Sequence, residues 1–371
     1  MVQSARIKTV LHEINLAACD QNGSVSSYDE RYFVISKNDK LRWIVPANPL
    51  LGKKVLAQWH PYGLVSQVAW FVLRCLYSLR CASLMPGVTG VTANVVRGVI
   101  VAGSKKVVSP VIYVGTRGSQ QKAVVTFVDL NTGQPLVIMK VALESGARIS
   151  LKREAETLKS LAQLGVRNVP KLLTIDNENG PTWQTVISGR LTSRKLTRSH
   201  IDFLLKLPRH TTTTLDHQKD ILCGLIESSG GGSFVELPGV IKKAINQIKG
   251  KKNIPLVLVH GDFAPWNLKR QPNNQLAAID WEDSEFDGLP LWDLCHFHYI
   301  QAYLFGDNKR VRSFLSGRLI KEYLQKLEIE KVDHAALVLL YLLGMVFQKN
   351  GNKNREFKDF LIEQVPLVLA N

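Results

Sequence analysis

The sequence predicts an α+β protein with two lobes, in which a sheet-rich lobe with one helix precedes a larger, mainly helical lobe. Three β-branched runs follow one another between residues 107 and 142, and a helical pattern comes directly after them. After Gly189 the pattern is mainly helical, interrupted by two short apolar runs that end at His260 and at Asp280. The chain of 371 residues is long enough for two or three domains.

Composition divides the chain into three segments. Residues 1–100 look like an accessory region of unassigned role, residues 101–188 form the sheet-rich lobe and residues 189–371 form the helical lobe. In the first segment, the run "RYFVISKNDKLRWIVPA" is typical of a hairpin that turns at Asn38-Asp39. Further breaks are predicted near Pro86-Gly87, at 228–233 and at 248–255.

The sheet of the first lobe is predicted from the runs "VVSPVIYVG", "AVVTFVDL" and "LVIMKVAL", which short turn-forming segments join into an antiparallel meander. In the helix that follows, Leu151, Ala155, Leu158 and Ala162 recur at i, i+4, i+7 and i+11 and therefore share one face. Gly165 is the predicted C-terminal stop of this helix. Two further strands are predicted at "PKLLTID" and "TWQTVIS".

The second lobe is predicted to be a set of helices. The segment "GVIKKAINQIKGK" carries an apolar stripe typical of a helix that ends at Gly250, and the last ~80 residues predict three or more helices. Residues 335–347 are almost wholly apolar but too few to span a membrane, so they are predicted to form a buried helix.

A longer apolar stretch, residues 68–85, contains Arg74 and Arg80. A central arginine is costly inside a bilayer, so the sequence argues against a spanning helix. Two interpretations remain, a basic helix that lies on a membrane surface and a helix that packs on its own protein, and the pattern favours the second.

The net charge of +16 and the pI near 9.6 indicate anionic or neutral partners, unless they only make a basic soluble surface. The sequence has no zinc finger, RNA-binding signature or recognition helix, so no specific nucleic acid is predicted as a partner. Five cysteines without a CxxC pair, and an N-terminus without a signal-peptide pattern, indicate a cytoplasmic location. A peripheral contact with an anionic membrane is compatible with the same charge.

The stretch "IPLVLVHGDFAPWNLKR", residues 254–270, carries the main chemical signal. An apolar run stops at His260-Gly261-Asp262, Asn267 follows Asp262 by five residues, and a second apolar run ends at Asp280. Because Mg²⁺ takes hard oxygen ligands together with phosphate oxygens, Asn267 and Asp280 are predicted to hold this metal. Asp262 is placed to accept the proton of an attacking hydroxyl, and the spacing matches the protein-kinase loop H-R-D-L-x-x-x-N with glycine in place of arginine.

The motifs "HGDFAPWN", "IDWED" and "GLPLWDL" resemble the aminoglycoside phosphotransferase and choline kinase-like family of small-molecule kinases. The resemblance covers roughly residues 107–305 and does not reach residues 1–100. It implies the two-lobed protein-kinase-like fold, with an N-lobe that binds ATP or GTP and a C-lobe that carries the catalytic loop. It also implies Mg²⁺, a small hydroxylated substrate and a structural role for Asp293.

Three further parts follow from the resemblance. Lys140, at the end of the third strand, is expected to bind the α- and β-phosphates. Its carboxylate partner is expected to be Glu154, which lies on the apolar face of the following helix, whereas Glu156 lies among charged residues. The backbone amides of Gly115 and Gly118 are expected to cover the phosphates, although a plain hairpin turn would carry the same glycines. The adenine is expected against the linker near residues 185–188.

Two departures from protein kinases concern the substrate. The interval between Asp280 and Asp293 is short and has no A-P-E triplet, which suits a small acceptor better than a polypeptide. The basic charge argues against polycationic aminoglycosides, so a sugar, an amino alcohol or a glycan precursor is the expected acceptor.

His296 and His298 are predicted to be core or helix-surface residues, because no carboxylate cluster with ligand spacing accompanies them.

Two other functions are compatible with the sequence. A nucleotide-binding pseudokinase, or a regulatory module that acts through its N-terminal region or basic surface, would keep the fold without turnover. A binder of an anionic membrane or of nucleic acid would need only the charge. The presence of Lys140, Asp262, Asn267 and Asp280 together favours an active kinase, and the sequence predicts no oligomeric state.

Overall fold

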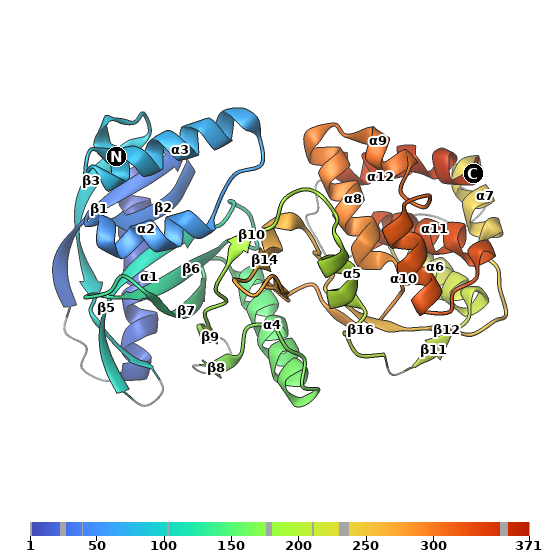
Figure 1. Ribbon diagram of the computed structural model, residues 1–371, viewed down its shortest axis with the longest axis horizontal. Helices are drawn as coiled ribbons and strands as arrows, with labels where there is room; N and C mark the ends of the chain where they lie inside the picture. The colour runs from blue at the N-terminus through green and yellow to red at the C-terminus, as the bar shows by residue number, and fades with distance from the viewer. Residues whose placement is uncertain are drawn as a thin grey trace. The chain divides into compact units, whose positions relative to one another are not determined.

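The computed structural model describes residues 2–22, 27–38, 40–101, 104–175, 180–209, 211–229, 237–348 and 355–370. The chain forms two compact units (Figure 1). The first comprises Met1–Leu191 and Lys269–Asn273, and the second comprises Thr192–Leu268 and Asn274–Asn371. Strands dominate the first unit and helices dominate the second, which confirms the predicted α+β class.

An antiparallel sheet of nine strands forms the centre of the first unit. The strands are β1 (Ser27–Lys37), β2 (Lys40–Pro46), β3 (Val88–Val96), β4 (Gly98–Val101), β5 (Ser104–Val114), β6 (Lys122–Asp129), β7 (Pro135–Ala142), β8 (Leu172–Ile175) and β9 (Thr182–Thr185). They pair in the order β3-β1-β2-β5-β6-β7-β9-β8, and β4 pairs with β5 outside this order. A short strand, β10 (Arg190–Leu191), follows the linker after β9.

The predicted hairpin and the predicted meander are both present. In the hairpin, β1 pairs with β2 so that Phe33 lies opposite Val45. In the meander, β5 pairs with β6 and β6 with β7 in sequence order. One residue of the hairpin turn, Asp39, and residues 230–233 of the predicted break at 228–233 lie outside the described part of the chain.

The strands of the first hundred residues are continuous with the predicted meander. β2 pairs with β5, and the register places Trp43 opposite Tyr113 and Ile44 opposite Ile112. Residues from both segments therefore bury their side chains in the same cores. The role of residues 1–100 and the boundaries drawn at residues 100 and 188 remain predictions.

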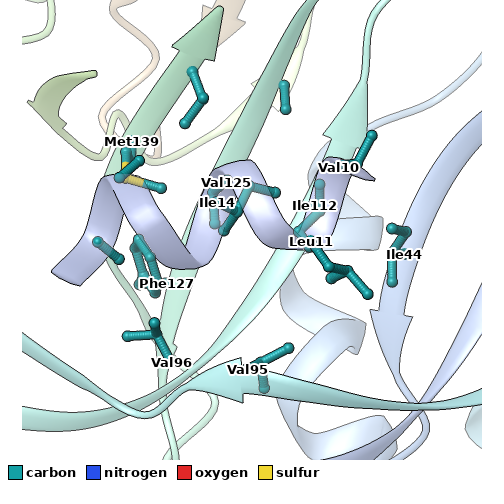
Figure 2. Packing of buried hydrophobic residues seen from close by; sticks show 14 of the residues in the cluster. Val10, Leu11, Ile14, Ile44, Val95, Val96, Ile112, Val125, Phe127 and Met139 are labelled. Atoms are coloured by element: carbon teal, nitrogen blue, oxygen red, sulfur yellow. The ribbon is translucent and has the colours of Figure 1, made fainter. Parts of the chain in front are cut away.

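One face of this sheet packs against helix α1 (Val2–Asn22). Side chains of successive strand residues point to opposite faces, so alternate positions of each strand meet the helix. Figure 2 shows Val10, Leu11 and Ile14 of α1 among Ile112 and Met139 of the strands. The spacing of the helix residues keeps them on one side, which is why α1 is held by packing along a single apolar stripe.

The second core of the first unit contains helices α2 (Pro49–Gln58) and α3 (Leu64–Ser78). Asn48 caps α2 by accepting a hydrogen bond from the backbone N–H of Leu50. Pro49 stands at the first helical position, where a backbone N–H would have no partner within the helix. The core combines Leu51 and Leu56 of α2 with Leu73 and Tyr77 of α3.

Helix α4 (Ser145–Gln163) follows β7 and contacts β7, β8 and β9. Its buried face carries Leu151, Ala155 and Leu158, as predicted, but the fourth predicted member was wrong. Leu161 is buried and Ala162 is exposed, because the buried face also includes Glu154 and Thr157 and is therefore centred on the side of Leu161. Gly165 follows the helix with a φ of +67°, as its predicted role as a stop requires.

The second unit is built mainly from helices. They are α5 (Arg198–Leu204), α6 (Leu215–Ser228), α7 (Gly239–Gln247), α8 (Trp292–Phe305), α9 (Asn308–Arg312), α10 (Arg318–Lys326), α11 (His334–Phe347) and α12 (Arg355–Leu369). Its short strands are β11 (Thr212–Thr213), β12 (Ile254–Pro255), β13 (Val257–Val259), β15 (Leu276–Ala278) and β16 (Glu285–Gly288). Strand β14 (Leu268–Arg270) lies where the chain passes between the units.

Helix α11 is the predicted buried helix of the second unit. All of its residues from 336 to 346 are buried, and it contacts α6, α7, α8 and α12. Across the part of the chain that the structure describes, no helix is both long enough and apolar enough to cross a membrane. The apolar character of α11 therefore serves the packing of the helices around it.

Candidate active site

The loop that the sequence predicts to be catalytic, residues 260–267, begins where β13 ends and is called the catalytic loop below. Its first turn requires Gly261, because the residue has a φ of +82° and a Cβ there would lie 2.0 Å from the backbone oxygen of Asp283. The chain can therefore reverse at this point only without a side chain. This close approach fixes the direction in which Asp262 leaves the strand.

Asp293, in the first turn of α8, holds the loop from below. Its two carboxylate oxygens accept hydrogen bonds from the backbone N–H groups of His260, at 2.8 Å, and Gly261, at 3.0 Å. Burial raises the pKa of the Asp293 carboxyl above its usual value, while the neighbouring His260 and the two amide bonds oppose this effect. The carboxyl thus satisfies two buried amides that the tight turn would otherwise leave without partners.

His260 connects the loop to the following strand region. Its ring Nε2 donates to the carbonyl oxygen of Ile279 at 2.9 Å, and the N–H of Ile279 donates to the carbonyl oxygen of Asn267, also at 2.9 Å. These bonds place the residue after Ile279, Asp280, beside the catalytic loop. His260 therefore braces the loop.

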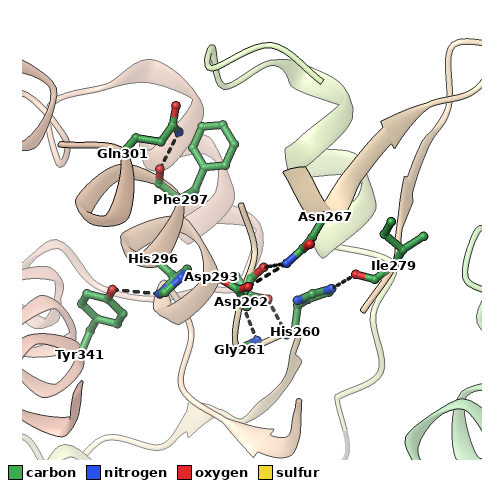
Figure 3. Close-up of polar contacts among 10 residues, drawn as sticks. All are labelled: His260, Gly261, Asp262, Asn267, Ile279, Asp293, His296, Phe297, Gln301 and Tyr341. Atoms are coloured by element: carbon green, nitrogen blue, oxygen red, sulfur yellow. Dashed lines mark hydrogen bonds and ion pairs between the residues drawn. The ribbon is translucent and has the colours of Figure 1, made fainter. Parts of the chain in front are cut away.

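The two polar residues predicted on the loop lie together. The side-chain amide nitrogen of Asn267 donates to Asp262 twice, to its backbone oxygen at 3.0 Å and to its carboxylate Oδ2 at 2.8 Å (Figure 3). Because the amide group is planar, these bonds direct the Asn267 oxygen away from Asp262. That orientation fits the predicted use of this oxygen as a metal ligand.

His296, which the sequence predicted to be a core or helix-surface residue, lies beside Asp262. It is buried, as predicted, but its Nε2 lies 2.9 Å from Oδ1 of Asp262, and its Nδ1 lies 3.2 Å from the hydroxyl of Tyr341 (Figure 3). Burial raises the pKa of Tyr341 well above its usual value, so the hydroxyl keeps its proton. Nδ1 of His296 therefore accepts the hydrogen bond from this hydroxyl, and Nε2, which faces the carboxylate, donates to Asp262.

Both carboxylate oxygens of Asp262 therefore have fixed partners, with Asn267 at Oδ2 and His296 at Oδ1. No sequence signal revealed His296, because it stands 34 residues after Asp262 and on a helix that is apolar on most sides. His296 follows Asp293 by one turn of α8, so the two side chains lie on the same face of the helix. This spacing could have indicated that His296 also contacts the loop. Asp293 holds the backbone of the loop, and His296 holds the carboxylate of Asp262.

Asp280 adopts an unusual backbone conformation for a residue with a side chain, with a φ of +69°. Such left-handed conformations cost free energy and persist where surrounding structure imposes them, often at functional sites. Among the described residues, no group of three or more histidine, cysteine, aspartate and glutamate side chains could hold a metal by itself. The predicted pair, one amide and one carboxylate, suits Mg²⁺, which completes its shell with phosphate oxygens and water.

In the first unit, Lys140 forms an ion pair with Glu154 of α4. The Nζ of Lys140 lies 2.6 Å from Oε1 and 2.7 Å from Oε2 of Glu154, and both side chains are buried. Glu156, the competing candidate, is exposed. A buried lysine held by both oxygens of one carboxylate has a fixed position, which a phosphate-binding cation needs.

The two candidate glycines lie in the turn between β5 and β6. The N–H of Gly115 donates to the carbonyl oxygen of Lys122 at 2.9 Å, so Gly115 belongs to the hairpin ladder. Gly118 has a φ of +151°, and a Cβ there would meet nothing within 4 Å. The turn therefore has open space beside Gly118, whereas the amide of Gly115 already has a backbone partner.

The linker after β9 contains an interaction that the sequence did not predict. Lys269 is buried, and its ammonium group donates to the carbonyl oxygen of Ile187 at 2.9 Å and to Oε1 of Gln58 at 3.0 Å. Burial lowers the pKa of Lys269 to about 8. Ile187 belongs to the stretch where the adenine was expected, so Lys269 fixes the backbone of that stretch.

The predicted residues thus form two groups, one in each compact unit. Lys140, Glu154, Gly115 and Gly118 belong to the first unit. Asp262, Asn267 and Asp280 belong to the second, where His260, Asp293 and His296 support them. The ion pair of Lys140 and the hydrogen bonds of Asp262 fit their predicted roles, whereas the amide of Gly115 is already bonded to Lys122.

Comparison with known families agrees with this geometry. The model of the family described as "Phosphotransferase enzyme family" (APH) matches residues 116–327. Because the match covers more than half of the chain, the protein belongs to the phosphotransferase enzyme family. This membership supports a small-molecule phosphotransferase with the two-lobed kinase-like fold. A search of curated proteins finds no match.

Several solved structures resemble the chain at low sequence identity. Choline kinase LicA from Streptococcus pneumoniae is 16% identical, with a TM-score of 0.43 over 69% of this chain and 91% of its own. Ethanolamine kinase from Plasmodium vivax is 11% identical, with a TM-score of 0.42 over 71% of this chain and 81% of its own. Wild-type aminoglycoside 2'-phosphotransferase-IIIa in complex with GDP is 14% identical, with a TM-score of 0.39 over 70% and 92%.

Proposed function

We propose that the protein transfers the γ-phosphate of ATP or GTP to a hydroxyl group of a small molecule. The observation that carries the proposal is the arrangement around Asp262, whose two carboxylate oxygens are held by Asn267 and His296 on a loop that Asp293 supports. Family membership supports the reaction class. Reactions of this class depend mainly on positioning and electrostatics, which such a constrained carboxylate supplies.

In this mechanism Asp262 orients the acceptor hydroxyl and takes its proton as the oxygen attacks the γ-phosphorus, while the bond from the γ-phosphorus to the β,γ-bridging oxygen breaks and ADP or GDP leaves. Asn267 and Asp280 would hold Mg²⁺. When bound, Mg²⁺ neutralises charge on the phosphate oxygens. The hydrogen bond from His296 keeps one oxygen of Asp262 occupied, so the carboxylate meets the acceptor in a single orientation.

Lys140 would bind the nucleotide phosphates, with Glu154 fixing its position and the turn at Gly115 and Gly118 covering them. Two buried side chains near Lys140 support a ligand on this face of the sheet. Thr182 lies opposite Lys140 in the pairing of β7 with β9, and Gln184 follows two residues later on the same face. Within the described residues, Oγ1 of Thr182 and Nε2 of Gln184 are buried without a hydrogen-bond partner, as groups awaiting a polar ligand would be.

The acceptor is, on this proposal, a sugar, an amino alcohol or a glycan precursor. The chain between Asp280 and Asp293 is too short to form a docking platform for a polypeptide, and the net charge of +16 disfavours polycationic antibiotics. The odd number of cysteines and the requirement for ATP or GTP support a cytoplasmic reaction.

A nucleotide-consumption assay with sugars, amino alcohols and glycan precursors tests the proposal. We expect Mg²⁺-dependent turnover with one acceptor class, and we expect Asp262→Asn to lower kcat by about 10²–10⁴-fold because it removes the proton acceptor. Asp359→Asn, at an exposed position of α12, is the matched control and should leave kcat unchanged.

Two results would contradict the proposal. Wild-type turnover in Asp262→Asn would remove the assigned role of this carboxylate. Nucleotide binding without turnover on any acceptor would instead support the nucleotide-binding pseudokinase.

A further inference from the structure

Helix α3 exposes an apolar stripe that the fold does not cover. Its members lie at steps of four, three, four and four residues, which places them on one side of a helix and its end. The stripe consists of Leu64, Val68, Phe71, Cys75 and Leu79. Leu64 is 82% exposed, Val68 and Phe71 are each 65% exposed, and Leu79 is 71% exposed.

The opposite side of the same helix is firmly packed. Leu73 and Tyr77 are buried in the second core of the first unit, and the hydroxyl of Tyr77 donates to the carbonyl oxygen of Pro46 at 2.6 Å. Trp70 donates from its ring nitrogen to the carbonyl oxygen of Trp59 at 2.9 Å. These contacts fix the rotation of α3 about its axis, so the apolar stripe faces solvent as a consequence of the fold. Contiguous exposed apolar surface of this kind marks an interaction site.

No carboxylate occurs in the chain segment that carries the stripe. Residues 40–128 contain 11 lysines and arginines and no aspartate or glutamate. Lys53 and Arg74 line a hollow of about 370 Å³ together with Phe71 and Leu79. A second hollow, of about 360 Å³, is lined by Arg31 of β1 and by Arg80, which follows the end of α3.

We propose that this surface docks the protein on an anionic phospholipid membrane, with α3 lying parallel to the bilayer. The apolar stripe would enter the boundary between headgroups and acyl chains, and the surrounding lysines and arginines would bind lipid phosphates. A second copy of the chain fits less well, because the lysines and arginines that line the two hollows would repel those of the other copy. The docking surface goes beyond the proposed phosphotransfer and does not depend on it.

Sedimentation of the full-length protein with lipid vesicles tests this docking. We expect binding to phosphatidylcholine vesicles that contain roughly a third of phosphatidylglycerol, and little binding to vesicles of phosphatidylcholine alone. Phe71→Ser combined with Leu79→Ser should weaken the partition coefficient roughly tenfold or more, because both side chains contribute buried apolar area. Both positions are exposed, so the variant keeps its core, and Val332→Ser, 79% exposed in the second unit, is the matched control.

Charge is tested separately with Arg74→Gln and Arg80→Gln. Each should reduce binding to anionic vesicles by roughly fivefold, the factor expected for one basic residue near a charged bilayer. Lys251→Gln, at an exposed lysine of the second unit, should have no effect. Equal loss in all three variants would mean that net charge alone causes binding and would contradict docking through α3.

A fluorescent probe on Cys75 reports the position of the surface directly. Replacing Cys19, Cys81 and Cys223 by serine leaves Cys75, which is exposed, and Cys295, which is buried and protected. We expect an environment-sensitive probe on Cys75 to shift to shorter wavelength with anionic vesicles and to be quenched by bromine on the lipid chains. A probe that does not respond while the protein sediments would overturn the assignment to α3. Light scattering that shows a dimer disrupted by Phe71→Ser and Leu79→Ser would identify a second copy as the occupant instead.

Discussion

Lys269 is a buried cation whose ammonium group, within the described part of the chain, donates to neutral oxygens of Ile187 and Gln58 and to no carboxylate. Burial of this charge costs desolvation free energy, and the hydrogen bonds of Lys269 fix the linker after β9. Burial lowers the pKa of Lys269 from 10.5 to about 8, so the folded protein releases this proton at a lower pH than the unfolded chain does.

The sign of the pH dependence follows from this difference. Between about pH 8 and pH 10.5 the unfolded state binds more protons at Lys269 than the folded state, so this residue's contribution to the free energy of unfolding rises with pH. Below pH 8 both states are protonated and the burial penalty is fully present. The rise amounts to about 3 kcal/mol at most, since each pKa unit corresponds to about 1.4 kcal/mol.

We therefore expect the free energy of unfolding of the wild type to rise, relative to that of Lys269→Met, when the pH is raised from 7 to 10. Urea unfolding at both pH values measures this difference. Lys251→Met is the control, because an exposed lysine should show no such change. Parallel behaviour of wild type and Lys269→Met would contradict the lowered pKa.

Site residues differed in how far the sequence revealed them. Asp262 and Asn267 could be predicted because the spacing of five residues on one loop brings them together locally, and Glu154 because helix periodicity separates it from Glu156. His296 and Lys269 could not be predicted from local pattern. Their partners lie 34 and 211 residues away in the sequence, so the contacts exist only after the tertiary fold has formed.

The catalytic loop as an element depends on one close approach. The carbonyl of Asp283 occupies the space that a side chain at position 261 would need, and Asp293 then binds the two amides of the turn. Any side chain at position 261 would meet backbone atoms of Asp283, so it must displace the backbone beside Asp262.

We expect Gly261→Ala to lower the free energy of unfolding by about 1–3 kcal/mol and to reduce kcat by at least about tenfold, because φ is positive and the nearest atoms are backbone. Chemical denaturation and the nucleotide assay measure the two effects. Gly224→Ala is the matched control, since Gly224 lies within α6 with open space around it and alanine favours the helix. An active and equally stable Gly261→Ala would show that the loop tolerates another path.

At the scale of the whole molecule, the first unit is assembled from segments far apart in sequence. The family match begins at residue 116, yet more than half of the buried residues of the core under α1 come from residues 1–100, and so do most of those in the core under α2 and α3. Local pattern predicted the hairpin and the meander separately. The pairing of β2 with β5 joins them, and no local signal could specify it because the partners are about 70 residues apart.

This arrangement predicts that the first unit cannot fold without its N-terminal segment. A chain that begins at residue 104 would expose one edge of β5 and the apolar faces that α1, α2 and α3 cover, so we expect residues 104–191 to lose hydrogen-exchange protection and to be cleaved rapidly by proteases. Co-expression with residues 1–103 as a separate polypeptide should restore protection, because it returns the missing strands and helices. Full protection in the shortened chain would show instead that the family segment is stable alone and that residues 1–100 are an appendage.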